Sequence, residues 1–103
     1  MNELGFPFRP VHPGELLKEE LEYRRISQKS FAKKFNLPYT ALNETLNSKR
    51  PVTTDFAMLM EAALGVPAYM LVGMQTDYNL QVAQKDSKLK KRLAEIRKLA
   101  AAL

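Results

Sequence analysis

Apolar residues recur along this chain at spacings of three and four, which is the repeat of a helix that buries one face. No segment alternates apolar and polar positions in the way that a half-buried strand does. Prolines and glycines interrupt the apolar stretches and mark where helices begin and end. The pattern predicts an all-α fold of six helices, at about residues 13–25, 28–35, 38–46, 54–64, 67–83 and 88–103.

Local signals support these boundaries. Pro13 suits the first position of a helix, Ser27 is a good N-cap, and Gly65 stops the fourth helix. Asn36 follows the second helix, where a left-handed backbone is usually needed and asparagine tolerates it best after glycine. The residues expected to face inward are Leu16, Leu17, Leu21, Phe31, Ala32, Phe35, Leu37, Leu42, Leu46, Phe56, Leu59, Met60, Ala63, Leu64, Met70, Leu71, Met74, Tyr78 and Val82.

The last predicted helix carries an apolar stripe about two heptads long, with Asp86 or Ser87 as its cap. The stripe consists of Leu89, Leu93, Ile96, Ala100 and Leu103. At the other end, two prolines that disfavour helix indicate an extended arm. We therefore expect an N-terminal arm at 1–12, a helical domain at 13–83 and a basic amphipathic helix at 84–103.

The segment from Ser27 to Arg50, SQKSFAKKFNLPYTALNETLNSKR, predicts two short helices joined by a tight turn. Ala32 is small where the two helices must approach closely, and Asn36 suits the turn. The second helix of the pair presents small polar side chains in a basic setting. This combination is typical of a helix-turn-helix that binds DNA in the major groove.

In such a motif the first residues of the second helix approach the base edges. Asn43 has the side chain that pairs with adenine, and Thr40 suits a base or a thymine methyl group. Tyr39 could contact a phosphate or a sugar, or occupy a half-buried packing position. The amides of Asn43 and Asn47 could also be ordinary surface groups. Glu44 could pair with Lys49 or with a cytosine amine. The candidate DNA-binding residues are Ser27, Gln28, Lys29, Tyr39, Thr40, Asn43, Glu44, Asn47, Lys49 and Arg50.

Charge is distributed unevenly along the chain. Of the net charge of +5, residues 24–50 contribute +6 and residues 85–103 contribute +5, whereas residues 51–84 hold three acids and no Lys or Arg. Such positive segments attract phosphate backbones, although a solvated basic face has the same composition. The positive field therefore coincides with the predicted helix-turn-helix and with the tail.

Other kinds of site find little support. The chain has no cysteine and one histidine, so we expect no disulfide, no metal site and no cofactor. His12 fits capping or packing of the first helix, and the acids of that helix fit a solvated face, so we expect no catalytic residue and no enzyme. No stretch is long enough for a membrane span and the start is unlike a signal peptide, so a cytoplasmic location is expected.

The chain resembles HigA-type antitoxins of the Xre branch of helix-turn-helix regulators over about residues 11–83. Three pieces carry the likeness: His12-Pro13-Gly14-Glu15, the stretch from Asn43-Glu44 to Asn47-Ser48-Lys49-Arg50, and Gln75 to Leu80. The resemblance implies a compact five-helix lambda-repressor-like (Xre) domain, usually dimeric, that binds operator DNA and represses its own operon. It also implies neutralisation of a HigB-like toxin, an mRNA-cutting ribonuclease. The basic tail after residue 84 lies outside the common pattern.

Two rival functions are consistent with the same residues. A stand-alone Xre-family transcriptional repressor would bind operator DNA without a toxin partner. A protein-interaction module would use the amphipathic tail and the fifth helix to bind a partner, and would bind DNA weakly and without sequence preference. The antitoxin function depends on the resemblance rather than on composition.

Overall fold

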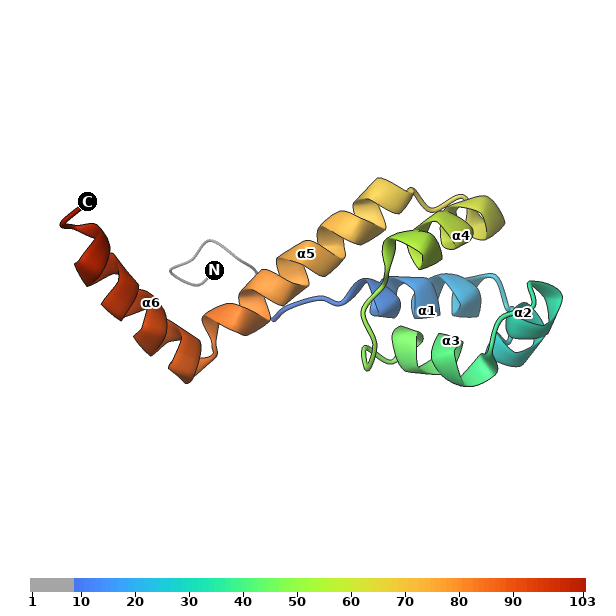
Figure 1. Ribbon diagram of the computed structural model, residues 1–103. Helices are drawn as coiled ribbons and strands as arrows, with labels where there is room; N and C mark the ends of the chain where they lie inside the picture. The colour runs from blue at the N-terminus through green and yellow to red at the C-terminus, as the bar shows by residue number, and fades with distance from the viewer. Residues whose placement is uncertain (1–8) are drawn as a thin grey trace. The chain divides into compact units, whose positions relative to one another are not determined.

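The computed structural model describes residues 9–103, so most of the expected N-terminal arm lies outside the described residues. The described part of the chain is all-helical, with six helices and no strand (Figure 1). The helices are α1 (Pro13–Tyr23), α2 (Gln28–Lys34), α3 (Tyr39–Leu46), α4 (Thr54–Leu64), α5 (Ala68–Gln84) and α6 (Ser87–Ala100). The all-α prediction is confirmed.

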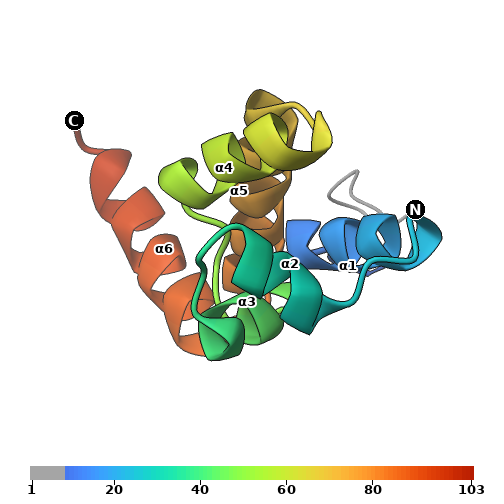
Figure 2. The ribbon, with the colours of Figure 1, turned by 90° about the vertical axis from the view of Figure 1, so that its right-hand side faces the viewer.

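Residues 11–76 form one compact unit and residues 77–103 belong to a second, so α5 begins in the first and ends in the second. Within the first unit, α3 lies against both α1 and α2 (Figures 1 and 2). The buried apolar core of this unit is made by α1 to α5 and two loop residues: Leu17, Leu21, Phe31, Ala32, Leu42, Leu46, Val52, Ala57, Met60, Leu64, Val66 and Leu71.

Two residues expected in the core are exposed. Phe35 is 38% exposed because it is the C-cap of α2, beyond the last helical turn, where its ring packs on that of Phe31 at 4.8 Å between centroids. Val82 is 47% exposed, whereas the adjacent Gln81 is buried. Since successive residues of a helix point about 100° apart, burying Gln81 turns Val82 towards solvent.

A buried glutamine also interrupts the expected apolar face of α5. Gln75 is 7% exposed, and its Oε1 accepts a hydrogen bond of 2.8 Å from the backbone N–H of Val52. An unpaired buried N–H is costly, so the amide is better suited to this position than an apolar side chain would be. Gln75 thereby holds the loop before α4 against α5.

Side-chain caps fix the starts of three helices, through Ser27 and Asp86 as expected and through Thr53. Pro38 and Pro67 were expected to be the first residues of their helices, but both lie just before them. Pro38 is the N-cap of α3, with an extended backbone (ψ 123°), and its carbonyl accepts the first helical hydrogen bond, from Leu42.

Three helices end with the same backbone motif although none has glycine at the critical position. Arg25, Asn36 and Ser48 have φ of 58°, 54° and 64°. After each of them, the next N–H bonds back to a carbonyl five residues earlier, as in Ile26 to Leu21 at 2.9 Å. This is the Schellman arrangement, which satisfies carbonyls at the end of a helix. A left-handed backbone was predicted for Asn36 and is confirmed there.

α1 begins with a capping box around His12, which is 1% exposed. Its Nδ1 accepts from the backbone N–H of Gly14 at 2.9 Å, while the Glu15 carboxylate accepts from the backbone N–H of His12 at 3.4 Å. The expectation that His12 caps the first helix is confirmed.

Burial lowers the pKa of His12 below its ordinary value of 6.5, and a backbone hydrogen bond at Arg50 and the charge of Glu15 oppose this shift only partly. The unfolded chain therefore takes up a proton that the folded chain excludes. The stability that neutral His12 provides is present above pH 6.5 and is lost as the pH falls towards the lowered pKa. Protonation also removes the Nδ1 lone pair that accepts from Gly14.

We expect the urea midpoint to fall as the pH is lowered from about 7 to about 5, because His12 becomes protonated on unfolding. The matched variant is His12→Asn, whose side chain caps a helix but does not titrate. It should be less stable at neutral pH, since it loses the ring, yet its midpoint should depend less on pH. If the urea midpoint of the native chain and that of the variant depended equally on pH, titratable groups other than His12 would cause the effect.

Candidate nucleic-acid interface

α2 and α3 pack as the two helices of a helix-turn-helix. The buried side chains of Phe31 and Ala32 on α2 and of Leu42 and Leu46 on α3 belong to one core. The turn between the helices is closed at Asn36, after which the N–H of Leu37 donates to the carbonyl of Ala32 at 2.8 Å. The small side chain at position 32 allows this close packing, as the sequence predicted.

A side-chain hydrogen bond joins the first residue of α2 to the middle of α3. Asn43 Nδ2, on α3, donates to Gln28 Oε1, on α2, at 2.9 Å. Both side chains are half-buried. The contact uses one of the two Nδ2 protons, so the other proton and Oδ1 stay available to a ligand. It therefore orients the Asn43 amide with both kinds of hydrogen-bonding group presented.

The first turn of α3 is open to solvent. Tyr39 is 42% exposed and Thr40 is exposed. The ammonium group of Lys29, at the start of α2, lies 5.8 Å from the centroid of the Tyr39 ring. This is within the range of a cation–π contact and places a positive charge beside the first turn of α3. The exposed fraction of Tyr39 fits a contact to DNA and a half-buried packing position alike.

The end of α3 differs from one sequence expectation. Glu44 does not pair with Lys49; its Oε1 lies 3.0 Å from Nη2 of Arg50. The left-handed backbone of Ser48 makes the N–H of Lys49 bond to the Glu44 carbonyl at 2.8 Å. This leaves the Lys49 side chain exposed and brings Arg50 back towards α3.

Asn47, the C-cap of α3, has a contact that no local pattern reveals. Its Oδ1 accepts from Nζ of Lys18 on α1 at 3.0 Å, and its Nδ2 donates to the carbonyl of Asn43 at 3.0 Å. Because the two residues are 29 positions apart, only the packing of α1 on α3 shows that Lys18 adds positive charge at this end of α3.

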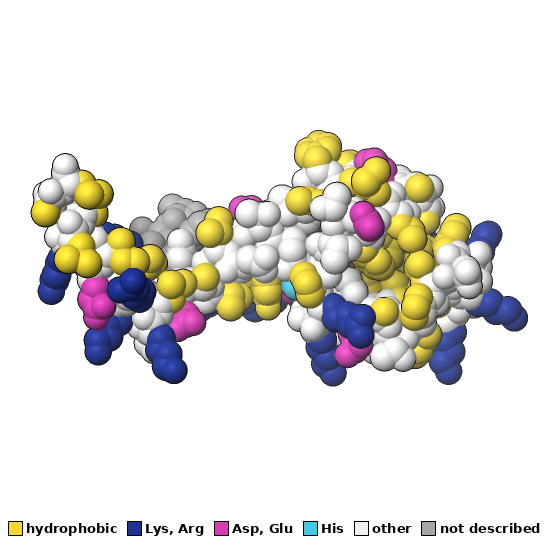
Figure 3. Space-filling model, in the orientation of Figure 1, with side chains coloured by type: hydrophobic (Ala, Val, Ile, Leu, Met, Phe, Trp, Pro, Cys, Tyr) yellow, Lys and Arg dark blue, Asp and Glu magenta, His cyan; other side chains and the backbone are white. Residues whose placement is uncertain are grey.

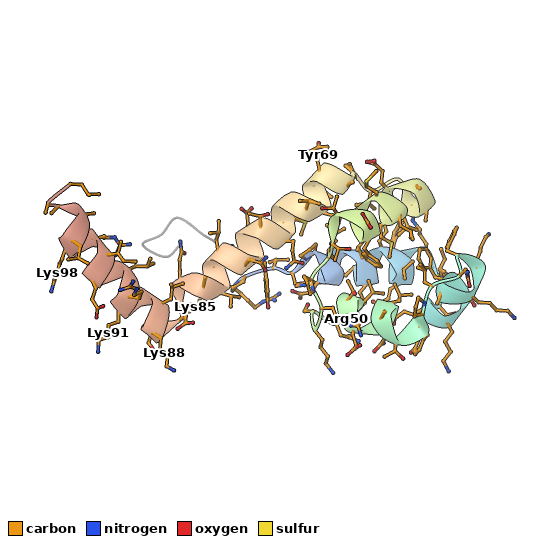
Figure 4. All side chains as sticks on the ribbon, viewed as in Figure 1. Arg50, Tyr69, Lys85, Lys88, Lys91 and Lys98 are labelled. Carbon is orange, nitrogen blue, oxygen red and sulfur yellow. The ribbon has the colours of Figure 1, made fainter. Side chains whose placement is uncertain are left out.

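The structure thus gathers most of the candidate residues on and around α3. The remaining candidate, Ser27, uses its hydroxyl locally: it accepts from the N–H of Ser30 at 3.1 Å and donates to the Ser30 hydroxyl at 2.8 Å. Lys and Arg side chains project from the surface over α2, α3 and the following loop (Figure 3), and Arg50 extends from that loop (Figure 4). The arrangement is chemically suited to a polyanion, with amides and a hydroxyl between cations.

Residues 9–103 contain no group of three or more His, Asp or Glu side chains that could hold a metal ion. Within the same residues, no helix is both long and apolar enough to cross a membrane.

Comparison with known proteins identifies relatives along most of the chain, although no family model matches it. Virulence-associated protein I of Dichelobacter nodosus is 34% identical over 77 residues, which cover 74% of this chain and 71% of the relative. An addiction module antidote protein of the HigA family from Coxiella burnetii is 32% identical, with a TM-score of 0.71 over 88% of this chain and 95% of the other.

A further solved structure is that of the Pseudomonas aeruginosa antitoxin HigA with the higBA promoter. It is 28% identical, with a TM-score of 0.68 over 73% of this chain and 83% of the other. The sequence likeness to the Coxiella protein extends over nearly that whole chain, and the helices superpose with it. This chain therefore belongs to the HigA family of antitoxins.

Proposed function

We propose that this protein is the antitoxin of a toxin–antitoxin pair and represses its own operon by binding operator DNA. The observation that carries the DNA-binding part is the helix-turn-helix of α2 and α3, with the amide of Asn43 held by a hydrogen bond to Gln28. The Pseudomonas relative that was solved with its promoter supports the same part of the proposal.

We assign the candidate residues two roles. Thr40, in the first turn of α3, and Asn43, three residues further along, contact base edges, because they carry the hydrogen-bonding groups that major-groove recognition uses. The others position the protein, chiefly through phosphates or through their neighbours: Ser27, Gln28, Lys29, Tyr39, Glu44, Asn47, Lys49 and Arg50. In this scheme Arg50 exchanges its contact with Glu44 for a phosphate.

The finer fold assignment belongs to the same proposal. Residues 13–83, which hold α1 to α4 and all but the last residue of α5, make a lambda-repressor-like (Xre) domain, and residues 84–103 form the basic C-terminal segment that carries α6. The domain acts in the cytoplasm as a homodimer whose two α3 helices lie about one turn of DNA, roughly 34 Å, apart. Operators for such a dimer are two-fold symmetric.

The toxin partner is a HigB-like ribonuclease, as membership of the family suggests. The test is to express the tagged chain together with its neighbouring reading frames and purify it at moderate salt. A co-purifying protein that poisons cells when expressed alone, and is harmless with this chain, supports the antitoxin function. If the chain purifies alone and no neighbour is toxic, it is a stand-alone Xre-family repressor.

Lys49→Ala should weaken binding to operator and non-operator DNA by the same factor, because an exposed ammonium group contacts phosphates and not bases. The expected loss is severalfold at low salt. The slope of log affinity against log salt should become shallower by about one unit, since one fewer counterion is released. Filter binding at several salt concentrations checks both; a loss confined to the operator would instead make Lys49 a base-reading residue.

A further inference from the structure

α6 presents an apolar face that nothing in the described chain covers. Every residue of the helix is exposed. Leu89 and Leu93 are each 37% exposed and Ile96 is 42% exposed, at the four-and-three spacing of a coiled-coil seam. An isolated helix of 14 residues is marginal in water, so an apolar stripe of this kind is expected to gain its stability by packing on something.

The stripe borders a groove of about 550 Å³ within the unit of residues 77–103. The last turns of α5 contribute Leu80, Ala83 and Gln84 to its wall, and α6 contributes Leu89, Lys90, Leu93 and Arg97. The wall is therefore apolar, with cations among its α6 residues. Gln84, one of these lining residues, has a buried Oε1 atom without a hydrogen-bond partner.

The charges beside the stripe oppose self-pairing of α6. With Leu93 and Ala100 at the a positions, Lys90 and Arg97 occupy e and Arg92 occupies g. In a parallel pair of α6 helices, Arg92 of one copy would lie opposite Arg97 of the other. In an antiparallel pair, Lys90 or Arg97 of one copy would lie opposite Lys90 or Arg97 of the other. Like charges across the seam destabilise a pair, so a second α6 is a poor occupant.

We propose that α6 and the end of α5 form a docking site for an acidic amphipathic helix of a partner protein. Apolar residues of that helix lie along Leu89, Leu93 and Ile96, and its carboxylates pair with Lys90 and Arg97. The other face of α6, where Lys88, Lys91 and Lys98 project (Figure 4), stays in solvent. The site shares no residue with the candidate DNA-binding residues.

The probe is a synthetic helical peptide with leucine at a and d and glutamate at e and g, labelled for fluorescence anisotropy with the full chain. The control peptide has lysine in place of glutamate. We expect the glutamate peptide to bind at least tenfold more tightly than the lysine peptide, with an affinity that falls as salt rises. Equal binding of the two peptides, or binding of neither, overturns the proposal.

Paired variants locate the site. Leu93→Gln with Ile96→Gln should abolish binding of the glutamate peptide, and Lys90→Gln with Arg97→Gln should weaken it several-fold. Lys91→Gln with Lys98→Gln removes the same charge from the solvent face and should have little effect. If the two charge-removing variants lost the same amount of peptide binding, the effect would come from net charge alone. That result would contradict specific docking in the groove.

The same proteins distinguish other occupants. Light scattering should give the native chain and the Leu93→Gln, Ile96→Gln variant the same mass, and a fall in mass for the variant would make a second copy the occupant. Binding to vesicles of anionic phospholipid that is tighter than binding to the glutamate peptide would make the site a membrane anchor and overturn the proposal. Operator binding by all variants serves as the check that they are folded.

Discussion

Replacing Gly14 with alanine should lower the free energy of unfolding by about 3 kcal/mol, although alanine is normally the better residue in a helix. A Cβ atom at this position would overlap the backbone carbonyl oxygen of Thr45 on α3 and would come within 2.9 Å of Nδ1 of His12. The carbonyl belongs to backbone, so it cannot move aside as a flexible side chain would. α1 and α3 must therefore separate, or α1 must lose its cap.

Gly73→Ala is the matched control, because it makes the same substitution where space allows it. Nothing lies within 4 Å of a Cβ at position 73, and the residue is in the interior of α5. Here the substitution should raise stability by about 0.8 kcal/mol through helix propensity alone. Urea unfolding of the two variants and the native chain measures both effects. A Gly14→Ala variant as stable as Gly73→Ala would show that α1 and α3 are not in close contact.

This contact also limits what the sequence alone reveals. Pro13 and Glu15 identify the start of α1 by their local chemistry. The need for glycine between them depends on α3, some thirty residues further along the chain, and no local pattern contains that information.

Helix ends, too, are only partly predictable from the local sequence. Asn36 was predicted to be left-handed because asparagine tolerates that backbone, whereas Arg25 and Ser48 adopt it without any such signal. The left-handed backbone costs about 1 kcal/mol at each of these residues, and hydrogen bonds to the last carbonyls of the helix offset this cost. After Arg25, for example, the N–H of Ile26 bonds to the carbonyl of Leu21. In this chain, residue type thus predicts the end of a helix only where the left-handed residue is glycine or asparagine.

The candidate interface was predictable as a segment but not as a set of contacts. The spacing of the apolar residues placed the polar side chains of α3 outward, which Thr40 and Tyr39 confirm by their exposure. The partners of Asn43, Glu44 and Asn47 come from Gln28, Arg50 and Lys18, and two of these three lie on other helices. They depend on the angle at which α2 and α1 cross α3, which the sequence pattern does not specify.

The largest effect on recognition is expected from Asn43→Ala. Under the proposed function, it should reduce the preference for operator over random DNA by about fivefold to 150-fold, because a bidentate contact to a base contributes about 1–3 kcal/mol. Binding to random DNA and its salt dependence should stay nearly unchanged, since no charge is removed. This is the opposite of the pattern expected for Lys49→Ala. Competition binding with duplexes selected from a random pool measures both the operator preference and the affinity for random DNA.

Gln28→Ala then tests whether orientation of the Asn43 amide matters. If the 2.9 Å hydrogen bond holds that amide towards the bases, Gln28→Ala should lose part of the same preference. The double variant should lose little more than Asn43→Ala does, because the two changes disrupt one interaction. Additive losses would make Gln28 an independent contact to DNA. An operator preference that survives Asn43→Ala intact would mean that α3 is not the helix that reads the bases.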